Sequence, residues 1–251
     1  MKEKFLEDGY VILKGFFPKE TVQEVVKRSK DIFEIQFNRF GYQEDFKENA
    51  VRLFNEQQEV FINCGKMIQQ GLLELYSLST NKRLIDEIKK LGIEFPVMCT
   101  RPVLFFNHPR LAKEEVYYKT PLHQDWPSME ASLDSVVVWV PLIDVNEQNG
   151  SILIYPKTHK LGDISNTVIG GFAAIENYDL SSYEEIQPIL EEGDIVVFSS
   201  LLVHKSGDIL NDEIRWSCHL RYTNMLEQDF IDRGFPHPYI YKPSLRSKTQ
   251  A

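Results

Sequence analysis

The chain has 251 residues, of which 43% are hydrophobic and 12% aromatic, so it can build a packed core and is not a disordered chain. A formal net charge of −9 argues against a general nucleic-acid-binding or anionic-membrane surface, although one local Arg or Lys can still hold a small anion. No apolar run approaches the roughly 18 residues of a membrane span, and the widely spaced Cys64, Cys99 and Cys218 favour reduced thiols in a soluble, cytoplasmic protein.

The first third of the chain is predicted to be helical, apart from a short strand at Tyr10–Leu13. After Pro18, apolar residues recur at helical spacing as far as Phe37. A second helical stretch is expected near residues 50–76 and a third near 81–91. We expect these helices to pack on the β-rich part of the chain that follows.

From about residue 95 the pattern changes to short β-branched and aromatic runs separated by turn residues. Strands are predicted at residues 97–107, 116–119, 135–142, 151–155, 186–190, 194–199 and 215–222. Turn sequences support these breaks, because Asn149-Gly150 joins two strands and Gly193 precedes another. Many short strands after a helical block predict a mainly β fold, a β-sandwich or jelly roll with helices packed on it.

Domain organisation follows from the same pattern. Segment 157–185 is poorly patterned and contains several Gly and Ser, so it is interpreted as an insertion over a cleft. There is no internal repeat or linker. The chain is therefore predicted to form one domain over 1–251, mainly helical in 1–95, with a jelly-roll core in 96–225 and a tail in 226–251 that wraps the surface.

Two histidines and a carboxylate stand in an order that suits a metal ion. His123 and Asp125 lie two residues apart in the run PLHQD, and His204 follows an apolar run. This is the ligand set of a 2-His-1-carboxylate facial triad, which holds non-heme Fe(II) by one face and leaves other positions open for a substrate and O₂. The period of two along a strand puts both side chains of the pair on one face, with Gln124 on the other.

The same residues also allow an interpretation without a metal. Six histidines and 37 acidic residues make a chance His-x-Asp pair common. His204, at the end of an apolar run, is either a satisfied core residue or a ligand that points into the barrel. The position of His123 after a strand run and a Pro favours the metal, because a rigid strand end can project both side chains to one side.

The predicted strand at 215–222 carries polar residues at alternate positions, and this face requires either water or a polar cavity. The polar positions are Arg215, Ser217, His219 and Arg221. An Arg-x-Ser pair directed into a barrel suits a carboxylate, because the guanidinium binds both oxygens and the hydroxyl adds a third donor. Arg221, on the same face, is the competing anchor.

Taken together, these motifs resemble those of a known family. The runs PLHQD, NGSILIYPKTHKLGD, GDIVVFSSLLVHKSG and IRWSCHL, in this order, are similar to the phytanoyl-CoA dioxygenase family of Fe(II)/2-oxoglutarate oxygenases, and EDGYVIL resembles its N-terminal signature. The resemblance covers about Val97 to Tyr222 and, more faintly, the N-terminal helices. It implies a double-stranded β-helix that carries iron near one open end. The combination of motifs is specific, whereas no single motif is.

The resemblance also implies roles for individual residues. The positions that match the iron ligands are His123, Asp125 and His204. Arg215, eleven residues after His204, matches the arginine that binds 2-oxoglutarate, and Ser206 and Trp139 match positions that line the co-substrate. Ser217, from the strand pattern above, completes the predicted co-substrate site.

Other candidate residues receive smaller roles. Where the family often has Pro-Gly-Ser/Thr-His, this chain has Lys157 at the Gly position, which we expect to change a loop without touching the iron. His159 in that loop is interpreted as structural, and His219 as a packing residue or one that supports a ligand. His237 is expected to be solvated in the tail. Asn107 or His108 is expected on a strand near the pocket, and neither is assigned to the site.

The function implied is an Fe(II)- and 2-oxoglutarate-dependent dioxygenase that hydroxylates an unactivated C–H bond of a small molecule and releases succinate and CO₂. Related halogenases have Gly or Ala at the carboxylate position, so Asp125 favours hydroxylation over halogenation. Substrate contacts are expected from segment 157–185 and the N-terminal helices. An acyl-CoA is the substrate that names the family, but no polybasic strip for the CoA phosphates is visible.

Three alternatives stay open. The same iron site can give desaturation or ring formation instead of hydroxylation. The chain can also be a metal-bound or 2-oxoglutarate-bound barrel that acts as a binding module without turnover, although the intact triad and Arg215 count against it. A redox-silent isomerase of the cupin type is weaker still, because such a site does not need the distal Arg. The sequence specifies neither the substrate nor the oligomeric state.

Overall fold

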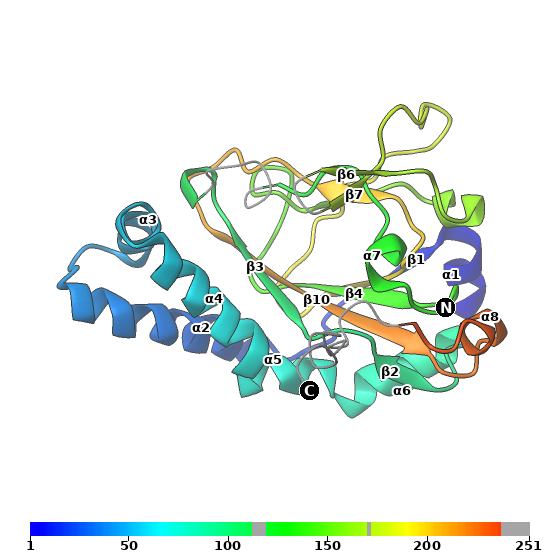
Figure 1. Ribbon diagram of the computed structural model, residues 1–251, viewed down its shortest axis with the longest axis horizontal. Helices are drawn as coiled ribbons and strands as arrows, with labels where there is room; N and C mark the ends of the chain where they lie inside the picture. Colours follow the sequence, from blue (N-terminus) through cyan, green and yellow to red (C-terminus); the bar gives the residue numbers. More distant parts are fainter. Residues whose placement is uncertain (112–118, 170–171, 237–251) are drawn as a thin grey trace, which may run out of the picture.

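The computed structural model describes residues 1–111, 119–169 and 172–236 of the chain. Helices α2, α4 and α5 lie along one side of an antiparallel sheet that contains β4 and β10, and strands β6 and β7 belong to a second, smaller β layer on its other side (Figure 1). The protein therefore has a β core with helices packed on it, as the sequence pattern predicts.

The N-terminal part is a helical block that contributes one strand to the sheet. Its elements are α1 (Lys2–Asp8), β1 (Tyr10–Leu13), α2 (Lys19–Phe40), α3 (Phe46–Glu56), α4 (Gln58–Gly71), α5 (Leu73–Ser79) and α6 (Lys82–Leu91). The strand and the first and last predicted helices are confirmed as β1, α2 and α6. The single helical stretch expected at 50–76 is wrong, because the backbone leaves the helical conformation at Gln57 (φ −140°, ψ 54°) and Leu72 (φ −71°, ψ 110°). These breaks let α3, α4 and α5 turn their apolar faces to one core.

Local sequence explains the helix ends that were predicted. The side chain of Asn81 accepts a hydrogen bond from the N–H of Leu84 at 3.2 Å, which satisfies one of the unpaired donors at the start of α6. Gly92 ends this helix with φ 118°, a conformation that favours glycine. In α2 the buried residues recur every three or four positions and form the stripe that faces the core: Val22, Val25, Ser29, Phe33 and Phe37.

The β-rich part forms one six-stranded sheet and two short pairs. Its elements are β2 (Pro96–Met98), β3 (Val103–Asn107), β4 (Val136–Pro141), β5 (Ile152–Ile154), β6 (Thr167–Ile169), β7 (Phe172–Ala174), β8 (Ile195–Ser199), β9 (His204–Ser206) and β10 (Arg215–Asn224). The large sheet has the order β1-β8-β4-β10-β2, and β3 also pairs with β10. The short pairs are β5-β9 and β6-β7, and His123 joins them through backbone bridges to His204 and Ala174.

Most of the strand predictions are confirmed. Strands β4, β5, β8 and β10 lie where they were expected, and the run at 97–107 contains β2 and β3 with a turn between them. The strand expected at 186–190 is wrong: Ile186 and Leu190 form only isolated bridges, and Pro188 between them cannot donate to a ladder. Most of the strand expected at 116–119 falls outside the described residues.

Two hydrophobic clusters cover the two faces of the large sheet. The cluster on one face joins the helices to the sheet and includes Phe33, Leu53, Val138 and Leu220. The cluster on the other face fills the space below the smaller β layer and includes Trp139, Ile154, Val196 and Phe198. The large sheet is thus buried on both sides, and the candidate site lies on its second face.

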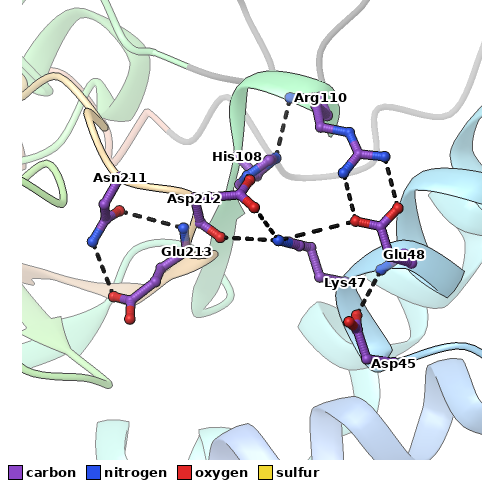
Figure 2. Close-up of polar contacts among 8 residues, drawn as sticks. All are labelled: Asp45, Lys47, Glu48, His108, Arg110, Asn211, Asp212 and Glu213. Carbon is purple, nitrogen blue, oxygen red and sulfur yellow. Dashed lines mark hydrogen bonds and ion pairs between the residues drawn. The ribbon is translucent and has the colours of Figure 1, made fainter.

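A polar network fastens α3 to the segment that leads into β10 (Figure 2). Arg110 donates two hydrogen bonds to the carboxylate of Glu48 at 2.6 and 2.8 Å, and Lys47 forms an ion pair with Asp212. His108, only 2% exposed, accepts from the backbone N–H of Arg110 at 3.2 Å and places Nε2 3.0 Å from Asp212 Oδ1. These contacts connect the helical block to the residues just before Arg215.

The expectation of reduced cysteines is confirmed, and the described helices agree with the lack of a long apolar run in the sequence. Cys64, Cys99 and Cys218 are free, buried thiols. Burial raises the pKa of Cys64 to about 11 and that of Cys99 to about 12, which keeps these thiols protonated and unreactive. Among the described residues, every helix is too short or too polar to cross a membrane.

Candidate metal centre

Three side chains from two parts of the chain meet between the β layers. The ligand atoms of His123, Asp125 and His204 all lie within 4.8 Å of one another, and all three residues are buried. The backbones of His123 and His204 exchange hydrogen bonds of 2.9 and 3.0 Å, which places the two rings side by side with centroids 4.1 Å apart. The structure thus brings together the three residues that the sequence predicted.

Asp125 reaches the cluster from a helix start and not from a strand. It has helical backbone angles (φ −78°, ψ −27°) at the N-cap of α7 (Trp126–Met129). Its backbone N–H donates to the backbone carbonyl of Ser200 at 3.0 Å. Its side chain does not cap the helix and is directed to the two histidines. Gln124 points elsewhere, since its amide donates to the carbonyls of Gly162 and Leu201. The side chains of Asp125 and Gln124 point in different directions, as predicted. The reason differs from the prediction, because Asp125 does not lie on a strand.

Both histidines are held in the tautomer that a metal requires. Nδ1 of His123 lies 2.8 Å from the carbonyl of Pro121, and Nδ1 of His204 lies 3.0 Å from the carbonyl of Leu202. Since a carbonyl only accepts, each Nδ1 carries the proton and each Nε2 presents a lone pair. Burial, together with the charge of the neighbouring imidazole, lowers the pKa of His204 to about 3, and burial also lowers the pKa of His123. Both rings are therefore neutral near pH 7.

Two atoms of the cluster face each other without hydrogen-bond partners. Oδ2 of Asp125 and Nε2 of His204 are 3.5 Å apart, both are buried, and neither forms a hydrogen bond with the described residues. A protein rarely buries such atoms unless a ligand satisfies them. A carboxylate oxygen and two imidazole nitrogens are suitable donors for a divalent transition metal. The residues present fit a metal ion.

The other oxygen of the carboxylate is held by Arg221, which the sequence had suggested as a co-substrate anchor. Its Nε and Nη2 lie 3.2 and 2.8 Å from Oδ1 of Asp125. Burial raises the pKa of Asp125, but the positive charge of Arg221, with a smaller electrostatic influence from the nearby imidazoles, more than offsets this effect and holds the pKa well below its usual range. The alternation along β10 placed Arg221 on the correct face but gave no information about its partner.

The polar face of β10 points into the protein and not into water. Arg215, Ser217 and His219 are 4%, 0% and 8% exposed, and the alternate residues pack against the helices. A small cavity beside His204 is lined by Trp139, Ser206, Arg215 and His219, among others. The sequence pattern allowed this polar face to meet either water or a polar cavity, and the structure shows a cavity.

The cavity brings together most of the predicted co-substrate residues. Arg215 donates to the carbonyl of Gly150 at 2.6 Å and to Oδ1 of Asn107 at 2.9 Å, so its guanidinium is fixed in place. The Ser206 hydroxyl lies 2.6 Å from that of Thr120. Ser217 is buried on the same face of β10 but does not line this cavity, and its role stays a prediction.

The remaining histidines lie in other environments. Nε2 of His159 is 3.2 Å from the carbonyl of Leu6, and its ring packs against Gly9, so it fastens α1 to the core as a structural residue. The ring of His219 packs against Phe105 with centroids 4.8 Å apart and lines the small cavity. His237 lies outside the described residues.

A family model described as phytanoyl-CoA dioxygenase (PhyH) matches residues 5–217. The chain belongs to the phytanoyl-CoA dioxygenase family. Human peroxisomal phytanoyl-CoA dioxygenase is 30% identical over 240 residues, which cover 87% of this chain and 67% of that protein. The bovine protein is 31% identical over 140 residues, but these cover 51% of this chain and only 40% of the relative. The chain thus spans less than half of several curated relatives that it matches.

Solved structures with the same fold include iron- and 2-oxoglutarate-dependent proteins. The epimerase SnoN, in complex with Fe³⁺, alpha ketoglutarate and nogalamycin RO, has a TM-score of 0.61 at 17% identity and covers 89% of this chain and 82% of that one. EctD from S. alaskensis, with 2-oxoglutarate and 5-hydroxyectoine, has a TM-score of 0.57 at 14% identity and covers 90% of this chain and 76% of that one. At these identities the likeness concerns the fold alone.

Family membership and the site agree on the cofactors. The cluster in this structure has the donor set of a facial triad, and the family is one of iron- and 2-oxoglutarate-dependent oxygenases. Iron is therefore the cofactor of this enzyme class, and 2-oxoglutarate and O₂ are its co-substrates.

Proposed function

We propose that this chain is an Fe(II)- and 2-oxoglutarate-dependent dioxygenase that hydroxylates an unactivated C–H bond of a small molecule and releases succinate and CO₂. The observation that carries this proposal is the buried His-Asp-His cluster, which lies beside a cavity lined by Arg215. Because the chain spans only part of several relatives, their activities are not transferred to it without a test. A cytoplasmic location stays a prediction from composition.

In this proposal the protein holds and orients the reacting groups. His123, Asp125 and His204 would hold the iron, and Arg215 would bind the distal carboxylate of 2-oxoglutarate through its planar guanidinium. Iron and 2-oxoglutarate together supply the oxidation of a C–H bond coupled to decarboxylation. The apolar cluster around Trp139 limits the entry of water, which strengthens the charge-assisted contacts inside the site.

Gly150 supports the proposed role of Arg215. Its φ is 79°, and a Cβ at this position would lie 3.3 Å from Nη1 of Arg215 and 2.9 Å from Cγ1 of Ile209. The carbonyl of Gly150 accepts from that same Nη1. A glycine here allows the backbone to approach the guanidinium closely, so that the arginine is positioned before the co-substrate binds.

At the level of architecture, we assign the two β layers to the two halves of a double-stranded β-helix. The large sheet supplies Arg215 and Trp139, whereas the smaller layer supplies His123 and His204. A site between two such layers is what this fold provides, and the similarity in fold to SnoN and EctD supports the assignment.

A groove of about 360 Å³ between α4 and β3, on the helix side of the large sheet, offers a place for the part of the prime substrate that lies away from the reacting atoms. Phe105 lines both this groove and the small cavity beside His204. Phe61 and Leu104 make the groove apolar, and the exposed Lys66 and Arg101 also line it. These features favour a small molecule with an apolar body and an anionic group. They support the expectation that N-terminal helices contact the substrate.

The proposal is tested by measuring succinate formed from 2-oxoglutarate by purified protein with Fe(II) and ascorbate, alone and with a metabolite library. Slow succinate formation alone and faster formation with one compound are expected. A protein that binds iron and 2-oxoglutarate but forms no succinate with any compound would favour the non-catalytic binding module. Mass spectrometry of the product separates hydroxylation, which adds one oxygen atom, from desaturation or ring formation, which removes two hydrogen atoms.

A further inference from the structure

We propose that Arg221 is a positioning residue, which holds Oδ1 of Asp125 so that this carboxylate presents only Oδ2 to the metal. The inference rests on the proposed function, because it concerns how the same cluster receives its ion. It assigns to Arg221 a role different from that of Arg215, although both lie on the polar face of β10.

The contacts of the carboxylate are divided between its two oxygens. Nε and Nη2 of Arg221 both approach Oδ1, at 3.2 and 2.8 Å. Oδ2 forms no hydrogen bond with the described residues and lies 3.5 Å from Nε2 of His204. One edge of the guanidinium thus takes one oxygen and leaves the other directed at the histidines.

Arg221 itself is fixed by the sheet on both sides. It pairs with Val137 of β4, and its carbonyl accepts from the backbone N–H of Cys99 at 3.1 Å. The side chains of Arg221 and Asp125 are 12% and 3% exposed, so their ion pair is largely removed from water. Its attraction is therefore weakly screened and its geometry well defined. This differs from a surface pair, whose geometry is seldom held so closely.

The position of Arg221 does not suit the co-substrate. Arg215 lines the cavity beside His204, whereas Arg221 does not. They are six positions apart along a strand, which corresponds to about 20 Å between their Cα atoms. The guanidinium of Arg221 already engages Asp125. We therefore assign the distal carboxylate of 2-oxoglutarate to Arg215 and the metal-binding carboxylate to Arg221.

The arrangement has a consequence for coordination. A carboxylate can bind a metal through one oxygen or through both. If Asp125 used both, it would occupy a position that a facial triad leaves open for the co-substrate and O₂. By holding Oδ1, Arg221 keeps that position available. It also balances the charge of the buried carboxylate when no metal is bound, because its guanidinium lies 2.8 Å from Oδ1.

The test compares Arg221→Met with Arg215→Met and uses Co²⁺ as the metal probe. Arg221→Met should weaken Co²⁺ binding about ten- to a hundred-fold, the usual effect of losing a group that orients a ligand. It should also change the visible spectrum of the Co²⁺-saturated protein, which reports ligand number and geometry. Arg215→Met should leave both unchanged. Arg221→Lys keeps the charge and should restore part of the affinity.

A second titration separates the two arginines by ligand chemistry. Oxalate chelates a metal but has no distal carboxylate, so its binding to the Co²⁺-loaded protein depends on the coordination sphere and not on the anchor. Arg221→Met should weaken binding of oxalate and 2-oxoglutarate alike, whereas Arg215→Met should weaken only 2-oxoglutarate. Arg233→Met, which breaks the pair between Arg233 and Asp229, controls for loss of an ion pair outside the cluster.

The possible outcomes distinguish the inference from the proposed function. If the wild-type protein does not bind Co²⁺, the proposed function is wrong. If it binds Co²⁺ and 2-oxoglutarate but Arg221→Met changes neither the Co²⁺ affinity nor the spectrum, only the role of Arg221 is wrong. A defect of Arg221→Met confined to 2-oxoglutarate would show that this residue is the anchor. Thermal unfolding of each variant identifies any that fail to fold, and Arg221→Lys then replaces Arg221→Met.

Discussion

Replacing Arg215 with Ala is expected to raise the 2-oxoglutarate requirement strongly and to leave metal binding largely intact. Arg215 is 4% exposed, and its guanidinium is held by the Gly150 carbonyl at 2.6 Å and by Asn107 Oδ1 at 2.9 Å. Truncating one partner of a desolvated charge pair costs roughly 2–5 kcal/mol. This corresponds to about thirty-fold to several-thousand-fold in affinity. Arg215→Lys should be intermediate, because a point charge replaces a planar fork.

The assay is a titration of metal-loaded protein with 2-oxoglutarate, followed by the same titration in the succinate assay. Asn107 and the Gly150 carbonyl lose a donor in Arg215→Ala, so thermal unfolding and Co²⁺ binding must be measured in parallel. Normal 2-oxoglutarate binding by Arg215→Ala, together with weakened binding by Arg221→Ala, would refute the assignment of the distal carboxylate to Arg215. In that case the co-substrate would lie near Arg221, and the register argument along β10 would be wrong.

Four further substitutions test the site and the fold. His204→Ala should lose tight Fe(II) binding and turnover with the fold intact, because one of three protein ligands is removed; unchanged metal content by elemental analysis would contradict this. Asp125→Gly should abolish hydroxylation, and near-normal product formation would show that another carboxylate is the ligand. Gly65→Leu should fill the α4–β3 groove and suppress substrate-stimulated succinate release without changing the basal rate, whereas Gly65→Ala, whose Cβ meets Phe106 at 3.8 Å, should not. Gly9→Ala should lower the free energy of unfolding by more than about 1 kcal/mol, because the new Cβ would lie 2.4 Å from Nδ1 of His159. Gly15→Ala is the control, since a Cβ at Gly15 would meet no atom within 4 Å, and equal thermal unfolding of the two variants would contradict this prediction.

The features predicted from sequence are those that local patterns determine. The alternation along β10 separates Arg215 and His219 from Trp216 and Leu220, and the structure buries the two sets on opposite faces. Turn and cap residues such as Gly92 mark where elements end. The order of the motifs along the chain was sufficient to identify the family.

The features missed depend on contacts between distant segments. Gln57 is neither Gly nor Pro, so nothing at that position interrupts the helical pattern, whereas Gly71, the last residue of α4, is a sequence signal for the break at Leu72 that the prediction did not use. The pairing of Arg221 with Asp125 joins residues 96 positions apart. A face can be predicted from periodicity, whereas the partner across that face cannot. Asp125 was predicted to reach the cluster from a strand but reaches it from the start of α7. The cluster requires only that the carboxylate point towards the two histidines, and more than one backbone conformation allows this.

The packing of the helices on the sheet limits how far this chain can be shortened. β1 lies at one edge of the large sheet and pairs with β8 along its whole length, from Tyr10 opposite Phe198 to Leu13 opposite Ile195. A shortened chain that began at β2 would lose that edge strand, expose the apolar face around Val138, and remove Lys47 from the network beside the start of β10. We therefore expect that the β-rich part, which carries the metal cluster, will not fold when it is expressed alone. Libraries for altered substrate use should therefore retain the N-terminal helical block in the expressed chain and vary the side chains that line the α4–β3 groove, including those on α4.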